Sequence, residues 1–228
     1  MIDTNNLKDN LKGILIEKND STHLIVTFGG VNRGIGVPVF EFFNILRENN
    51  TDKAFVRDFL QMWYLNGVDD EISTFEKLKV QLESVIKGYE KVTFIGNSMG
   101  GYAAILFGVL LKVDKVVAFA PQTFIDAKNR FWRFDRRWRI QINKIHRTKL
   151  YMEYYDLKSF FNKIQINQEI KKTSIDIYYS TKHRLDRQHA EQLKNFKNVT
   201  LYGYKDGGHE VIKTLKSSGE LRTVLKNL

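Results

Sequence analysis

Residues 91–108 read KVTFIGNSMGGYAAILFG, and they form the most informative pattern in the chain. The first five, 91–95, are a short apolar run that predicts a strand buried on both faces of a sheet. Residues 99–111 are almost wholly apolar and long enough for a buried helix. Between them, residues 96–100 match the pattern G-x-S-x-G and predict a sharp turn from strand to helix.

The serine of this turn, Ser98, is the candidate nucleophile. Gly96 and Gly100 leave room for two backbones to cross closely, which a tight strand-to-helix turn requires. The turn would lift the Ser98 hydroxyl above the carboxyl edge of the sheet, and the Met99 N–H would point to where an oxyanion forms. The alternative is a glycine-rich turn whose serine only caps the helix.

Short apolar runs alternate with helical patterns on both sides of this turn, which predicts βαβ units and a mostly parallel sheet. We therefore expect an α/β fold with flanking helices, as a single domain over residues 1–228. Residues 121–173 break the alternation, and we interpret them as a basic, helical, cap-like insertion over one end of the sheet. The expected strands are 14–17, 24–28, 54–59, 91–95, 115–120, 174–179 and 199–204, and the expected helices are 39–47, 72–86, 99–111, 187–196 and one at the C-terminus.

Composition narrows the function classes. The 228 residues include no cysteine, which excludes disulfides, thiolate metal sites and a cysteine nucleophile. No His/Asp cluster with metal-ligand spacing is visible, so we expect no metal site. The N-terminal residues are polar, and the longest apolar run, 102–111, is far shorter than a membrane span. We expect a cytoplasmic protein, with peripheral contact at the inner membrane face as an alternative.

With residues 95–108 (IGNSMGGYAAILFG) and 115–126 (KVVAFAPQTFID), the chain resembles the α/β-hydrolase superfamily. The first segment is similar to the nucleophile elbow of that superfamily, and the second to the next strand and its exit loop. The resemblance implies a catalytic triad in the chain order Ser, then Asp or Glu, then His. It also implies acyl transfer through a covalent acyl-serine.

His209 is the candidate general base. The chain has five histidines, His23, His146, His183, His189 and His209, and only His209 follows the last expected strand. The superfamily places its base there, and Gly207 and Gly208 would let the loop curl back over the elbow. The alternative is a histidine of a surface loop.

Asp186 is the candidate acid that orients His209. The resemblance implies an aspartate close behind strand 174–179, about where His183 stands, so this chain departs from the pattern. Asp186 is the carboxylate of the loop before the next expected helix, and an N-cap of that helix is the alternative role. His183 and Asp206 remain secondary candidates.

A second oxyanion donor is expected in the glycine-rich loop after strand 24–28. By resemblance to the oxyanion loop of the superfamily, Gly30 and Val31 are the candidates beside Met99. A dinucleotide-binding interpretation of residues 29–36 is weaker, because the glycine spacing is wrong and Pro38 stands where a phosphate-binding helix would start.

The insertion carries most of the net charge. Residues 128–149 hold nine Lys or Arg and one acid, a net charge of +8 out of +10 for the whole chain. Such a segment suits an anionic glycan, a phosphorylated cofactor such as coenzyme A, or an anionic membrane. Nucleic acid ranks below these, and a solvated lid is the plain alternative. The candidate substrate- or polyanion-binding residues are Arg133, Arg136, Arg137, Trp132 and Trp138.

More loosely, residues 28–30 with 38–44, 95–108 and 120–126 are similar to small hydrolase-fold proteins of bacterial capsule and surface-polysaccharide clusters, some of them O-acetyltransferases. This similarity implies a serine esterase or O-acyltransferase that adds or removes O-acyl groups on a carbohydrate. No cofactor is expected to stay bound, and acetyl-CoA would be the donor of a transferase. The expected partners are a small-molecule ester, acyl-CoA or an anionic glycan. The alternative is a non-catalytic hydrolase-like module that binds a polyanion or a protein.

Overall fold

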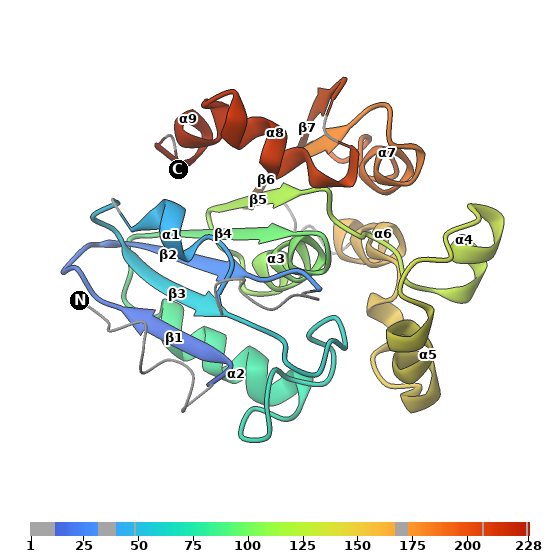
Figure 1. Ribbon diagram of the computed structural model, residues 1–228. Helices are drawn as coiled ribbons and strands as arrows, with labels where there is room; N and C mark the ends of the chain where they lie inside the picture. Colours follow the sequence, from blue (N-terminus) through green and yellow to red (C-terminus); the bar gives the residue numbers. More distant parts are fainter. Residues whose placement is uncertain (1–11, 32–39, 48, 167–172, 207, 227) are drawn as a thin grey trace.

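A computed structural model describes residues 12–31, 40–47, 49–166, 173–206, 208–226 and 228. Seven strands form one sheet in the order β1-β3-β2-β4-β5-β6-β7. β1 pairs antiparallel with β3, and the other neighbours pair in parallel (Figure 1). The strands are β1 Ile14–Glu17, β2 His23–Phe28, β3 Asp52–Val56, β4 Lys91–Asn97, β5 Lys115–Phe119, β6 Ser174–Ser180 and β7 Val199–Tyr204.

Helices cover both faces of the sheet, because alternate strand residues point to opposite sides. On β2, Leu24 and Val26 join the core beneath α2 and α3, whereas Ile25 joins the core beneath α1, α8 and α9. The mostly parallel α/β architecture expected from the sequence is confirmed. The helices are α1 Phe43–Leu46, α2 Phe75–Ile86, α3 Met99–Leu110, α4 Ala127–Trp132, α5 Arg139–Thr148, α6 Leu157–Ile166, α7 Arg184–Glu191, α8 Val211–Ser217 and α9 Glu220–Lys226.

The position of the central helix α3 explains why its sequence is apolar throughout. Every residue from Met99 to Val109 is buried, so the helix has no polar face. Close approach to the sheet requires Gly108, because a Cβ there would lie 2.4 Å from Val116 Cγ2. Among the described residues, no helix is both long and apolar enough to span a membrane.

Some element boundaries differ from the sequence predictions. α2 begins at Phe75 rather than at residue 72, because the Thr74 hydroxyl accepts a hydrogen bond from the Lys77 N–H and caps the helix. The strand expected at 54–59 lies at Asp52–Val56. The helix expected at 187–196 is α7, Arg184–Glu191, which begins earlier and ends earlier.

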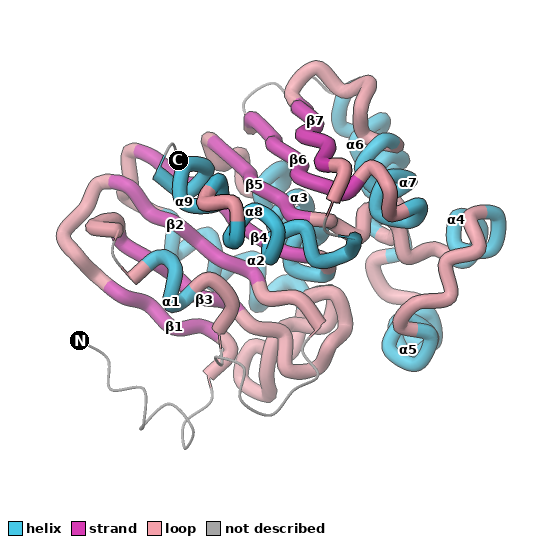
Figure 2. The backbone as a smooth tube through the Cα atoms, turned by 45° about the horizontal axis from the view of Figure 1, so that its top comes forward, coloured by secondary structure: helices cyan, strands magenta, loops and turns pink. Residues whose placement is uncertain are grey.

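The insertion has two parts with different surroundings. Its second part packs into the main core, since Leu157 and Phe161 of α6 are buried beside α3 residues. Its first part carries α4 and α5, which both views show at the margin of the molecule, away from the sheet (Figures 1 and 2). Within residues 121–173, α4 and α5 are therefore the part that lies apart from the sheet (Figures 1 and 2).

Candidate active site

Ser98 lies on a strained turn between β4 and α3. Its φ of 54° and ψ of −114° are unfavourable for a residue with a side chain. The surroundings hold it in place, because the Ser98 N–H donates to the Phe119 carbonyl (2.8 Å) and its carbonyl accepts from Gln122 (3.2 Å). The side chain is fixed above the carboxyl edge of the sheet, as the G-x-S-x-G pattern predicted.

The two glycines of the turn are required by contact with neighbouring backbone. A Cβ on Gly96 would lie 2.0 Å from the Gly100 carbonyl oxygen, and a Cβ on Gly100 would lie 2.0 Å from the Phe28 carbonyl oxygen. Neither neighbour is a flexible side chain that could move aside. The turn therefore passes against the end of β2, which brings the Gly29–Gly30 backbone close to Ser98.

His209 and Asp186 complete a hydrogen-bonded chain with Ser98. The Ser98 Oγ lies 3.1 Å from His209 Nε2, and His209 Nδ1 lies 2.9 Å from Asp186 Oδ1. An ionised carboxylate only accepts, so the proton between them belongs to His209 Nδ1. Nε2 of the neutral ring is then left to accept the Ser98 proton.

The structure brings these three residues together from distant segments. Ser98 follows β4, Asp186 comes after β6, and His209 follows β7 in the 3-10 turn Gly208–Glu210 (η4). All three strands are parallel, so their carboxyl ends meet at one edge of the sheet. Asp186 differs from expectation in one respect: it lies in the first turn of α7, not in the loop before it.

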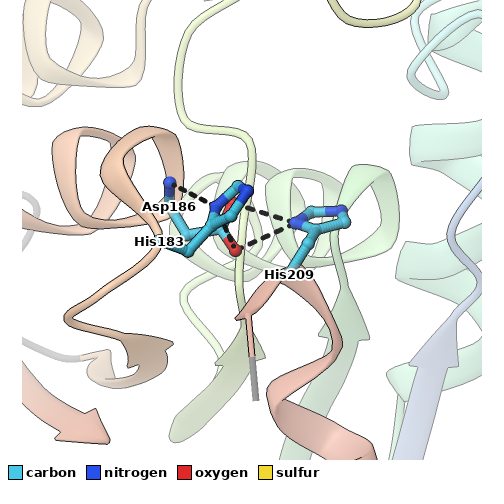
Figure 3. Close-up of side chains that lie close together, drawn as sticks. All are labelled: His183, Asp186 and His209. Atoms are coloured by element: carbon cyan, nitrogen blue, oxygen red, sulfur yellow. Dashed lines mark hydrogen bonds and ion pairs between the residues drawn. The ribbon is translucent and has the colours of Figure 1, made fainter. Parts of the chain in front are cut away.

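His183 supplies the cap of α7 that Asp186 was considered for, which explains why the aspartate is free to face His209. The His183 Nδ1 lies 3.3 Å from the Asp186 N–H and 3.1 Å from its Oδ2 (Figure 3). This nitrogen accepts from the helix N–H when it carries no proton, and it donates to the carboxylate when protonated. The other secondary candidate, Asp206, forms an exposed ion pair with Lys182.

The ligand atoms of His183, Asp186 and His209 all lie within 4.8 Å of one another, which is also a geometry that could hold a metal ion. The sequence had suggested no such cluster, because a helix and a strand separate His183 from His209 in the chain. The hydrogen bonds to Ser98 and within the group use the same atoms. A metal at this position would therefore replace the hydrogen bonds that join Ser98, His209 and Asp186.

Arg137 holds the Asp186 carboxylate from the side of the insertion. Its Nη1 donates to Asp186 Oδ1 (3.0 Å), while Nε and Nη2 form a bidentate pair with Asp135 (3.1 and 2.8 Å). Both aspartates are almost fully buried. Burial raises the pKa of Asp186, but the hydrogen bond and charge of His209 and the charge of Arg137 outweigh it and hold that pKa below its usual value.

A second buried group extends this network. The His189 Nε2 donates to Asp135 Oδ2 (3.0 Å), and its ring stacks on Phe124. Burial lowers the pKa of His189 to about 4, so the ring is neutral near pH 7. For Asp135, burial acts in the other direction, but the hydrogen bonds from His189 and Arg137 hold its pKa well below the usual value.

The expected oxyanion donors have different surroundings. The Gly30 N–H donates to Glu41 Oε2 at 2.7 Å, so this donor is already engaged. Val31 lies next in the chain and is only partly buried, against the main core. Met99 is the first residue of α3, where a backbone N–H has no partner within the helix. Gly30 is therefore the candidate whose N–H already has a partner, and Met99 and Val31 remain candidates. Residues 32–36 of this loop lie outside the described residues.

Glu41 is a site residue that sequence reasoning missed. Its Oε1 accepts from the Asn97 side-chain amide (2.8 Å), so the carboxylate ties the Gly30 backbone to the residue before Ser98. Burial raises the pKa of Glu41, and the hydrogen bonds from Gly30 and Asn97 lower it only in part. No local pattern in the sequence singles out this glutamate.

The five residues proposed to bind a polyanion differ in their exposure and contacts. Trp132 and Arg136 are exposed. The Arg133 guanidinium stacks over Phe124, and Trp138 packs against the core. Arg137 is occupied by two buried carboxylates and is not a free surface cation. Sequence charge alone did not distinguish the inward-facing arginine from the outward-facing one.

Solved structures show the same architecture. No protein-family model and no curated protein matches this chain. The chain is similar to the capsule O-acetyltransferase of Neisseria meningitidis serogroup A, at 17% identity and a TM-score of 0.63, over 95% of this chain and 92% of that one. The chain has the α/β-hydrolase fold.

Two structures from Staphylococcus aureus support the same conclusion. The fluorophosphonate-binding serine hydrolase FphF is 14% identical with a TM-score of 0.62, over 89% of this chain and 82% of that one. S-formylglutathione hydrolase is 12% identical with a TM-score of 0.58, over 89% and 83%. At these identities the likeness establishes the hydrolase fold, which is the fold implied by residues 95–108.

Proposed function

We propose that the chain is a serine enzyme that acts on acyl esters through an acyl-Ser98 intermediate. One observation carries the proposal: Ser98 Oγ lies 3.1 Å from His209 Nε2, and His209 Nδ1 lies 2.9 Å from Asp186. A hydroxyl, a base and an orienting acid in hydrogen-bond contact are what nucleophilic catalysis by serine requires.

The proposed reaction has two half-reactions. Ser98 Oγ attacks the ester carbonyl while its proton passes to His209 Nε2, and Asp186 stabilises the resulting imidazolium. Met99 and Val31 N–H groups stabilise the oxyanion of the tetrahedral intermediate. The intermediate collapses to acyl-Ser98 as His209 returns the proton to the leaving alcohol or thiol. Water or a sugar hydroxyl, deprotonated by His209, then takes the acyl group and restores Ser98.

We propose O-acyl groups, in particular acetyl groups, on a bacterial surface polysaccharide or related carbohydrate as the substrate. The structural similarity to a capsule O-acetyltransferase supports this choice. A mutant of that enzyme has been solved in complex with CoA, which supports acetyl-CoA as the donor if this chain is a transferase. Because acetyl-CoA is an intracellular metabolite, a transferase that uses it would act in the cytoplasm.

Reaction with a fluorophosphonate probe tests the nucleophile. We expect the wild-type protein to be labelled and the Ser98→Ala variant to remain unlabelled, since phosphonylation needs an activated serine hydroxyl. Ser180 is a matched control: it is also buried at the end of a strand, and Ser180→Ala should keep labelling. Absence of labelling in folded wild-type protein would instead support a non-catalytic, hydrolase-like binding module.

Product analysis separates the two chemical outcomes. The protein is incubated with acetyl-CoA and candidate glycans, and acetylated glycan is compared with free acetate. Glycan acetylation that disappears in Ser98→Ala supports transfer. Release of acetate alone supports an esterase and contradicts the transferase.

A further inference from the structure

Exposed apolar side chains gather in the first part of the insertion. Among the described residues, nine large hydrophobic side chains are exposed, and six of them lie between positions 131 and 152. Scattered exposed hydrophobics are ordinary, but such a concentration is typical of a docking surface. The six residues, called here the apolar set, are Phe131, Trp132, Phe134, Ile140, Leu150 and Met152.

The three aromatic members of the apolar set are mostly exposed to water and are not packed against the core. Phe131, Trp132 and Phe134 are 72%, 71% and 69% exposed. They do not form the buried face of a helix, because α4 has no buried residue, whereas the neighbouring α5 buries Ile142 and Ile145. The protein thus keeps three large aromatic rings in water at its margin, where α4 and α5 stand apart from the sheet (Figure 2).

Residues 127–152 are strongly positive, although exposed Glu153 follows them directly. The exposed ionisable residues between 127 and 152 are all cations, since the one acid there, Asp135, is buried. The rest of the chain, by subtraction of +8 from +10, carries only +2. These six exposed cations are Lys128, Arg136, Arg139, Lys144, Arg147 and Lys149.

We propose that α4, α5 and the turns that flank them dock on an anionic lipid bilayer. Aromatic side chains are favourable at the headgroup boundary, and each Lys or Arg near an anionic surface contributes about 1 kcal/mol. The aliphatic members Ile140, Leu150 and Met152 gain from contact with acyl chains, whereas a nucleic acid or a glycan offers them neither stacking nor hydrogen bonds. A second copy of the chain fits poorly, because it would set two positive faces against each other.

Trp132 gives a direct spectroscopic test with the full-length protein. Trp63 is 0% exposed and Trp138 packs against the core, so Trp132 is the tryptophan that a bilayer would move from water into an apolar environment. We expect vesicles of phosphatidylcholine with phosphatidylglycerol to shift tryptophan emission to the blue, and vesicles of phosphatidylcholine alone to leave it unchanged. Trp132→Phe should keep sedimentation with vesicles and lose the shift.

Sedimentation with vesicles measures the two contributions separately. The combined variant Phe131→Ala, Trp132→Ala, Phe134→Ala and the combined variant Arg136→Glu, Arg139→Glu should each weaken binding by about tenfold or more. Matched controls lie on other exposed surfaces: Val80→Ala for the apolar change, and Lys87→Glu with Lys194→Glu for the charge change. Circular dichroism confirms that each variant is folded.

Three results overturn the proposal. One is that folded wild-type protein does not bind the anionic vesicles. Another is binding to heparin or an oligonucleotide but not to vesicles, which identifies a polyanion site. The third is a dimer in light scattering that the aromatic variant dissociates, which identifies a self-association face. None of these results depends on Ser98, so this test and the labelling test fail independently.

Discussion

The Arg137 guanidinium connects the marginal insertion to the Asp186 carboxylate, with 3.0 Å between Nη1 and Oδ1. The same arginine holds Asp135 through two further nitrogens, so one side chain neutralises two buried carboxylates. The insertion therefore contributes a side chain to the site.

Replacing Arg137 is expected to impair both catalysis and stability. Arg137→Met removes the cation that contacts both buried carboxylates and leaves Asp135 only with the more distant Arg130, at 3.8 Å. We expect this loss to cost about 3–5 kcal/mol of the free energy of unfolding. We expect kcat for a soluble ester such as p-nitrophenyl acetate to fall about 10- to 100-fold, with KM little changed, because Asp186 loses its fixed orientation. Arg137→Lys should recover part of kcat, and exposed Arg139→Met should match wild type. A folded Arg137→Lys or Arg137→Met protein with wild-type kcat contradicts this positioning role.

Asp186→Asn tests whether Asp186 is the acid that orients His209. We expect kcat to fall about 10³- to 10⁴-fold, because an amide cannot stabilise the imidazolium of His209 or enforce its tautomer. His183→Gln is the matched variant, since His183 contacts the same carboxylate but not Ser98. It should lower kcat by less than about tenfold. The reverse order of effects would assign the catalytic role to His183.

Glu41 is expected to support the oxyanion loop. Glu41→Gln keeps an acceptor for the Gly30 N–H and should leave kcat within a few-fold of wild type. Glu41→Ala removes the link between Gly30 and Asn97 and should lower kcat about tenfold, since small displacements of an oxyanion donor are costly. Steady-state kinetics on the same soluble ester measure both. Equal activity of the alanine and wild-type proteins would show that the link is not needed.

Gly100→Ala tests the contact between the serine turn and β2. The added Cβ meets the Phe28 carbonyl oxygen at 2.0 Å, and we expect the free energy of unfolding in urea to fall by about 3 kcal/mol or more. Gly88→Ala is the control, because Gly88 has a φ of 90° but nothing within 4 Å of the new Cβ. It should cost about 1 kcal/mol through backbone strain alone. Similar losses in the two variants would argue against the clash.

We expect His189 to make the free energy of unfolding depend on pH. Its pKa is about 4 when folded and near 6.5 when unfolded, so the unfolded chain binds more protons between these values. The contribution of His189 to stability is present above pH 6.5 and is lost as pH falls toward 4, by up to about 3 kcal/mol.

The variant His189→Gln separates the contribution of His189 to stability from that of Asp58. Burial raises the pKa of Asp58 to about 6, so Asp58 makes the fold more stable as pH falls through the same range. The difference between wild type and His189→Gln in urea unfolding cancels the Asp58 term. That difference should shrink as pH falls from 7 to 4.5, and a difference independent of pH is the contrary result.

The parts of the fold and of the site that short sequence patterns encode could be predicted. The seven strands were recognisable from short apolar runs, and the serine turn from two glycines flanking Ser98. His209 could be selected because it follows the last strand. The loop-to-helix boundary near Asp186 could not, because a histidine side chain, His183, starts α7 earlier than ordinary helix signals indicate.

The amino-acid sequence by itself determined the order of strands and helices, the serine on its cramped turn, and the positive charge of the insertion. These follow from periodicity, glycine placement and composition, which are properties of neighbouring residues. Only the tertiary structure decided that Arg137 faces inward to Asp186 while Arg136 stays in water, and that Glu41 holds Gly30. Such pairings join residues up to 49 positions apart, and they depend on which polar groups are left to satisfy one another once the sheet and its helices have packed.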